Sequence, residues 1–108
     1  MLKKTNKLIP LYGGMLNVVI TDNMGKFAAS KGLDANVDYE AMCFQQGSSI
    51  YILFQPHTEL HYIVHECKHA VNYTFKRVGY QLDIENDEPE CYLLMWIFNQ
   101  CLKTKTAI

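Results

Sequence analysis

The chain has 108 residues and a mass of 12.5 kDa, which is enough for a single domain, residues 1–108, with one hydrophobic core. Apolar residues make up 49% and charged residues 19% of the sequence, a balance that excludes a disordered or low-complexity chain. Ten basic and eleven acidic residues give a net charge of -1, so nucleic acid is not expected as the main ligand.

Cysteine usage and apolar runs point to a cytoplasmic protein without a membrane segment. The cysteines are spread without a C-x-x-C pair, as is typical of reduced thiols: Cys43, Cys67, Cys91 and Cys101. The longest apolar run, residues 92–98, is far shorter than the roughly 20 residues that span a bilayer. Early lysines before an apolar stretch imitate an export signal, but Pro10 and the Gly13-Gly14 pair interrupt that stretch.

The first half of the chain predicts two β-hairpins. Residues 8–12 and 16–21 are aliphatic and β-branched runs on either side of Gly13-Gly14, a pair suited to a tight turn. Residues 39–45 and 49–54 flank Gln46-Gly47-Ser48 in the same way.

Three helices are predicted around these strands. A short one over residues 24–30, capped by Asp22 or Asn23 and ended by Gly32, is expected to cover one face of the sheet. A long one runs from an N-cap at Thr58 to Val78 and ends at Gly79. The last, Glu90 to Lys103, is apolar on nearly every side and should be central to the core. The fold class is therefore α+β, with a small, mostly antiparallel sheet against the long helix and a C-terminal core helix.

The long predicted helix contains the sequence His65-Glu66-Cys67-Lys68-His69, which matches the H-E-x-x-H pattern. Residues four apart lie one above the other on a helical face, so the imidazoles of His65 and His69 can bind one metal ion. Glu66 lies about 100° further round the helix, within reach of a water molecule at the metal. This arrangement predicts a Zn²⁺ site with Glu66 as general base. The alternative is a pair of ordinary polar histidines on an amphipathic helix.

Histidines also occur at positions 57 and 61, so four histidines repeat at a spacing of four. His61 and His69 are about 12 Å apart along a helix, too far to share one ion. His61 and His65 lack a glutamate in the second position, where Tyr62 stands. We therefore interpret His61 as a substrate contact or as a partly exposed histidine beside the site.

A catalytic zinc ion generally has three protein ligands, so a third donor is needed. Glu88 and Glu90, at the start of the last predicted helix, both qualify. Glu88 shares a helical face with Met95, and Glu90 shares one with Ile97, so the apolar periodicity does not choose between them. Either carboxylate is also favoured near a helix N-terminus by the helix dipole alone.

Residues 65–70 read His-Glu-x-x-His-Ala, and Glu88 lies four positions before Tyr92 in the next helix. In this respect residues 49–102 resemble zincin-type zinc metallopeptidases of the gluzincin pattern, whose third ligand is a glutamate on a later helix. They also resemble compact H-E-x-x-H proteins encoded by bacteriophages and other mobile elements, which implies the host cytoplasm. The resemblance implies a minimal zincin-like domain with Glu88 as third ligand and Glu90 in reserve. The third histidine of metzincins and the short glutamate motif of thermolysin-like enzymes are missing.

The resemblance implies hydrolysis of a peptide or protein substrate, with Glu66 taking the proton of the attacking water. Tyr92 is the first candidate to stabilise the developing oxyanion, ahead of the other donors Tyr73, His61 and Arg77. Residues 49–54 are expected to offer a strand edge to the substrate. A single small domain has a shallow cleft, so the specificity should be narrow.

Two other functions remain open at this stage. The first is a non-catalytic zinc-binding module, an inactive relative that captures a protein partner. The second and weaker one is an accessory factor that contacts nucleic acid through terminal lysines such as Lys3 and Lys105. The sequence does not predict the oligomeric state.

Overall fold

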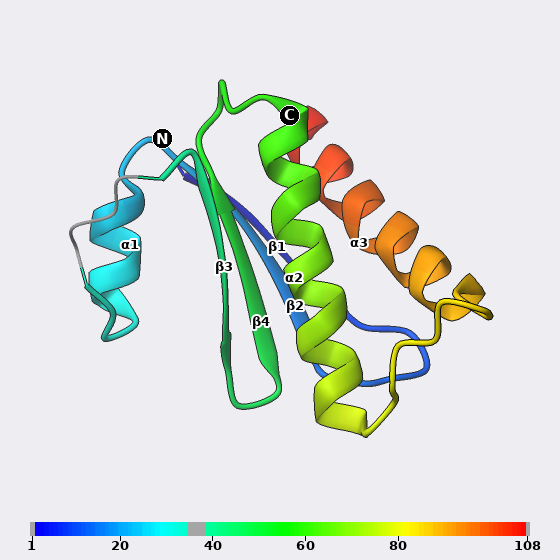
Figure 1. The fold of residues 1–108 in the computed structure, drawn as a ribbon. Helices are drawn as coiled ribbons and strands as arrows, with labels where there is room; N and C mark the ends of the chain where they lie inside the picture. Colours follow the sequence, from blue (N-terminus) through cyan, green and yellow to red (C-terminus); the bar gives the residue numbers. More distant parts are fainter. Residues whose placement is uncertain (1, 35–38, 108) are drawn as a thin grey trace.

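A computed structural model describes residues 2–34 and 39–107 (Figure 1). Along the chain, the elements are β1 (Leu2–Leu8), β2 (Met15–Thr21), α1 (Met24–Ser30), β3 (Ala41–Gln46), β4 (Ser49–Phe54), α2 (Leu60–Val78) and α3 (Glu88–Thr106). The strands form one sheet in the order β1-β2-β4-β3. The fold class is therefore α+β, as predicted. Among the described residues no helix combines the length and the apolar composition that crossing a membrane requires.

The sheet joins two antiparallel hairpins through one parallel pair of strands. β1 pairs with β2 and β3 pairs with β4 in antiparallel fashion, whereas β2 and β4 run parallel at the centre, with Met15 opposite Ser49. The prediction that the strand at 49–54 offers a free edge is wrong, because β4 lies between β2 and β3. Its side chains show why: Ile52, Leu53 and Phe54 are fully buried, as in a strand covered on both faces. The edge strands are β1 and β3.

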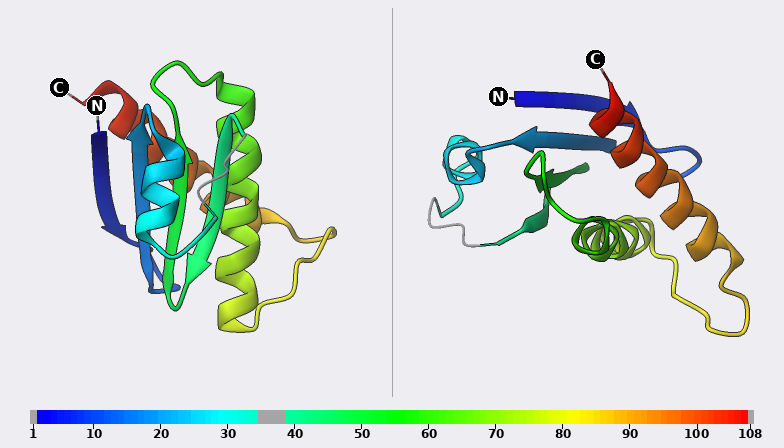
Figure 2. Two further views of the ribbon diagram at one scale, coloured as in Figure 1. Left: turned by 90° about the vertical axis from the view of Figure 1, so that its left-hand side faces the viewer. Right: turned by 90° about the horizontal axis from the view of Figure 1, so that it is seen from above.

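The helices enclose the sheet from both sides (Figure 2). α2 and α3 cover one face, where the larger core cluster includes Val18, Ile52, Phe75 and Ile97. α1 covers the other face, where Val19 and Leu53 belong to a smaller cluster. Even-numbered residues of β2 and β4 thus pack on one face of the sheet and odd-numbered residues on the other, because side chains alternate along a strand. Burial of each large apolar side chain contributes about 1.5–3 kcal/mol.

The first strand lies earlier than predicted. Residues 8–12 were expected to be a strand, but β1 ends at Leu8 and the chain then forms the turn to β2. Pro10 has no N–H to donate to a strand pair, and Leu11 has a positive φ of 66°. β1 itself is an exposed edge strand rich in lysine, so it lacks the apolar alternation that marks a half-buried strand.

Helix boundaries agree with the prediction at both ends of α1 and at the C-terminal end of α2. Asn23 caps α1 by accepting the backbone N–H of Lys26 at 3.0 Å, and Gly79 ends α2 in the left-handed conformation. The predicted N-cap at Thr58 is wrong. α2 begins after Glu59, and the buried Thr58 hydroxyl instead accepts the N–H of Gln55 and donates to a backbone carbonyl. Thr58 therefore fixes the bend between β4 and α2.

α3 is longer and less buried than predicted. It begins at Glu88 rather than Glu90 and ends at Thr106, and only one stripe faces the core: Leu93, Ile97, Gln100, Cys101 and Thr104. Tyr92 and Met95 are each 66% exposed, so the outer face of this apolar helix is left uncovered in the structure. The prediction that the last helix is central to the core is therefore wrong. α3 covers one side of the core and exposes its other face to solvent.

Candidate metal centre

The two histidines of the motif converge on the face of α2 that points away from the core. The Nε2 atoms of His65 and His69 lie 3.2 Å apart, and the rings meet edge to face with centroids 4.8 Å apart. Two imidazole nitrogens bound to one tetrahedral zinc ion at 2.0–2.1 Å each stand about 3.3 Å apart. The two nitrogens lie within hydrogen-bond distance of each other, and their separation is also close to that of two zinc-bound imidazole nitrogens.

Glu66 joins the two histidines from the more buried side of the helix. Its Oε2 lies 3.8 Å from Nε2 of His65, and its side chain is 14% exposed, compared with 68% for His65. One ligand atom from each of the three residues lies within 4.8 Å of the others. Burial raises the pKa of the Glu66 carboxyl, and the charges of His65 and His69 oppose that rise. A raised carboxyl pKa beside two potential zinc ligands is the property expected of a general base.

The surroundings of Glu66 explain its burial. Its neighbour Cys67 is fully buried in the core stripe of α2, and Ile63 and Ala70 lie one turn away on the same stripe. The charge of Glu66 adds to burial in raising the pKa of the Cys43 thiol on β3, so the carboxylate lies on the side of α2 that faces this edge strand. Glu66 is thus held between the open histidine pair and the sheet edge.

The structure does not bring either predicted third ligand to the histidines. The group formed within the described residues comprises His65, Glu66 and His69, without Glu88 or Glu90. Oε2 of Glu90 lies 2.7 Å from Nζ of Lys68 and forms an ion pair with it. Glu88 instead lines a pocket at the start of α3.

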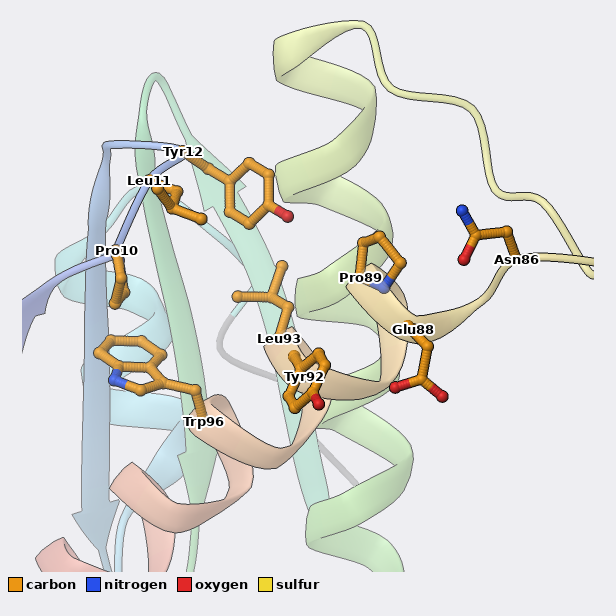
Figure 3. Close-up of a pocket in the computed structure, with 9 residues that line it drawn as sticks. All are labelled: Pro10, Leu11, Tyr12, Asn86, Glu88, Pro89, Tyr92, Leu93 and Trp96. Carbon is orange, nitrogen blue, oxygen red and sulfur yellow. The ribbon is translucent and has the colours of Figure 1, made fainter.

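Tyr92, the first candidate for oxyanion stabilisation, lies in that same pocket with Glu88 (Figure 3). It belongs to the exposed outer face of α3. Of the other donors, Arg77 donates to the carbonyl oxygens of Tyr12 and Gly13 at 3.2 and 2.6 Å. His61 is exposed, 3.7 Å from the carboxylate of Glu59.

Tyr73 packs against the main core cluster. It lies one turn after His69 and two turns after Glu66 on α2, and it is half-buried. Side chains four residues apart on a helix are neighbours, so Tyr73 and His69 share one face of α2. Tyr73 is thus adjacent to His69 along α2, whereas Tyr92 lies on the exposed outer face of α3.

Sequence reasoning missed Lys68 as a residue of this region. It occupies one of the two variable positions of the motif, and it donates to Asn72 Oδ1 at 2.7 Å as well as pairing with Glu90. The spacing of Lys68 and Asn72 is a recognisable i, i+4 pair. The contact with Glu90 depends on how α2 and α3 pack, which no local pattern reports.

Searches of protein-family models, curated proteins and solved structures find no match to the chain.

Proposed function

We propose that the chain is a zinc-dependent metallopeptidase of narrow specificity, in which His65 and His69 hold the ion and Glu66 is the general base. The observation that carries this proposal is the 3.2 Å separation of the two Nε2 atoms beside the recessed carboxylate of Glu66. The separation is that of a hydrogen bond between the two imidazoles, and two nitrogens bound to one tetrahedral zinc ion would stand at nearly the same distance.

Each residue has a defined part in peptide hydrolysis. A zinc ion, when bound, supplies Lewis acidity that polarises a peptide carbonyl and lowers the pKa of water. Glu66 accepts the proton of the attacking water and passes it to the leaving amine, a role that a raised pKa favours. The Tyr73 hydroxyl donates to the developing oxyanion. β3, a sheet edge beside α2, offers unpaired backbone groups to an extended peptide.

The openness of the site favours a narrow rather than a digestive activity. The side chain of His65 is 68% exposed, so little of the enzyme excludes water from the reaction. Binding energy must therefore come from a specific substrate that covers the histidine pair itself. A protein or peptide that docks along β3 and over α2 would do so.

A second function is favoured by one specific observation. Glu88 and Glu90 both lie outside the histidine group, so within the described residues the ligand set of a catalytic zinc ion is one short. A non-catalytic module that captures a partner through zinc, with the partner supplying a ligand, is consistent with this. The two functions differ in the role of Glu66.

Cleavage of a fluorogenic peptide library by the zinc-loaded chain separates the two functions. The peptidase predicts cleavage by the wild type and a loss of at least about 100-fold in Glu66→Gln, with zinc content unchanged. Glu59→Gln, at the exposed start of α2, is the matched control and keeps the wild-type rate. No cleavage by the wild type, or equal rates for wild type and Glu66→Gln, would contradict the peptidase function and favour the non-catalytic binding module.

Zinc affinity measured for Glu88→Ala and Glu90→Ala identifies the third ligand. A catalytic site that uses Glu88 predicts weakened zinc binding in Glu88→Ala alone, after a shift of the first turn of α3 toward α2. A module with two protein ligands predicts the same affinity for both variants and the wild type.

A further inference from the structure

A second concave site lies away from the histidines, between the turn that joins β1 to β2 and the first turns of α3 (Figure 3). This pocket has a volume of about 570 Å³, within the range of pockets that hold small organic ligands. We call it the aromatic pocket, and its main lining residues are Tyr12, Glu88, Pro89, Tyr92, Leu93 and Trp96.

Three aromatic side chains supply its walls. Tyr12 comes from the β1–β2 turn, and Tyr92 and Trp96 come from successive turns of α3. The Tyr12 ring is fixed by an edge-to-face contact with Phe75, with ring centroids 5.3 Å apart, and Leu93 below is 4% exposed. The ring faces of tyrosine and tryptophan attract cations, tryptophan most strongly.

The charge at the aromatic pocket is negative. Glu88 is the charged residue among those that line it. Carboxylates gather in the adjoining segment at Asp83, Glu85, Asp87, Glu88 and Glu90, and positions 78–102 contain no lysine, arginine or histidine. Lys68 neutralises Glu90, but within the described residues no basic side chain pairs with Glu88. These full negative charges exceed the partial positive charge of the α3 N-terminus.

Arg77, the nearby cation, does not neutralise the negative charge at the pocket. Its guanidinium donates to the carbonyl oxygens of Tyr12 and Gly13 and is not a lining group of the pocket. The pocket therefore combines aromatic walls, an apolar floor and a carboxylate, and no lysine, arginine or histidine is among its lining residues.

We propose that the aromatic pocket binds an organic cation: an ammonium group on an apolar body, with the charge next to Glu88 and the body against Tyr92 and Trp96. A free amine and a basic side chain of another protein share this chemistry. The proposal goes beyond the peptidase, and none of the three residues of the histidine group lines the pocket.

Trp96 makes the proposal directly measurable, since it is the single tryptophan of the chain. The probe is benzyltrimethylammonium, titrated in the presence of EDTA at constant ionic strength, with benzyl alcohol and benzenesulfonate as neutral and anionic counterparts. Binding is followed by Trp96 fluorescence and by the NMR shift of the indole N–H. We expect saturable binding of the cation, at least about threefold tighter than that of the alcohol, and no saturable binding of the sulfonate. Equal affinity for the cation and the alcohol would overturn the proposal.

Matched variants test the two parts of the site. Glu88→Gln removes the charge and keeps the shape, and we expect it to weaken cation binding about three- to tenfold. Glu85→Gln makes the same charge change in the same acidic segment, outside the pocket, and should change the affinity less than twofold. Tyr92→Leu keeps an apolar wall but removes the aromatic ring. It should lower the affinity for benzyltrimethylammonium more than the affinity for benzyl alcohol. Equal effects of Glu85→Gln and Glu88→Gln would contradict a localised site, and unchanged melting temperatures exclude misfolding as the cause.

A last arm distinguishes the source of the cation. N-acetyl-phenylalanyl-lysine amide presents the same chemistry on a peptide. Tighter binding of this peptide than of benzyltrimethylammonium supports a basic side chain of a protein as ligand, and the reverse order supports a free amine. Failure of both to saturate the Trp96 signal overturns the proposal, whatever the outcome of the peptidase assay.

Discussion

The ammonium group of Lys68 lies 2.7 Å from the carboxylate of Glu90, and this ion pair joins the middle of α2 to the first turn of α3. Lys68 is a residue of the H-E-x-x-H segment, and Glu90 was the reserve candidate for zinc. The pair thus engages Glu90 in a contact between the two helices.

A double-mutant cycle on this pair is expected to give a small coupling energy. The side chains are 38% and 22% exposed, so solvent screens their attraction, and a coupling of about 0.5–1 kcal/mol is expected. The free energy of urea unfolding is compared for wild type, Lys68→Met, Glu90→Gln and the double variant. A coupling of zero within error at low salt would show that the pair does not form in solution.

Gly14 is expected to be the least replaceable residue of the β1–β2 turn. Its φ is +81°, and an added Cβ would lie 2.5 Å from the carbonyl oxygen of Ser48 and 2.8 Å from the Arg77 guanidinium. Gly14→Ala should therefore lower the free energy of unfolding by about 3 kcal/mol, from backbone strain and steric overlap together.

Gly13 provides the matched control for this substitution. It has a similar φ of +71°, but an added Cβ would meet nothing within 4 Å. Gly13→Ala should therefore lower the free energy of unfolding by only about 1 kcal/mol, from backbone strain without steric overlap. Equal losses for the two variants in urea denaturation would contradict the close packing of the turn against β4 and α2.

Part of this fold follows from local sequence and part does not. Asn23 marks a helix start through its side-chain hydrogen bond, Gly32 and Gly79 mark helix ends through a positive φ that the lack of a side chain allows, and the structure confirms these ends. The position of β1 differs from the prediction because an edge strand buries little of either face. Its sequence therefore shows no alternation of apolar and polar residues. Thr58 was misassigned because its hydroxyl bonds to Gln55 and Glu40 across a bend.

The candidate site divides in the same way. The spacing of His65, Glu66 and His69 on one helix is local, so the sequence predicts their convergence directly. The third ligand depends on the packing of α3, and two apolar faces of that helix looked equally suited to the core. The structure buries the face of Ile97 and exposes that of Met95, which turns Glu90 toward Lys68 and leaves Glu88 at the aromatic pocket.

Thiol labelling with an aromatic disulfide reagent should detect one fast cysteine in the native chain. Cys91 is exposed, whereas Cys67 and Cys101 are buried with their sulfur atoms 3.8 Å apart. The hydrogen bond with Cys101 and burial raise the pKa of Cys67, and burial raises that of Cys43, so neither forms the reactive thiolate.

The rate of Cys91 labelling should depend on pH and salt in a defined direction. Loss of solvation, together with the carboxylates of Asp87, Glu88 and Glu90, raises its pKa. Less thiolate is therefore present at pH 8 than in a free cysteine, so the rate should keep rising at higher pH and should increase when salt screens the carboxylates. Cys91→Ser should abolish the fast phase. Its persistence would show that a second thiol is accessible.

Zinc stoichiometry by mass spectrometry of metals, measured after dialysis, tests the central claim most directly. Wild type should retain one zinc ion per chain, and His65→Ala and His69→Ala should each lose it, since one imidazole cannot chelate alone. His61→Ala, one turn away on the same helix, should retain the ion. A wild type without zinc, or an equal loss of zinc in His61→Ala, would contradict a site built on His65 and His69.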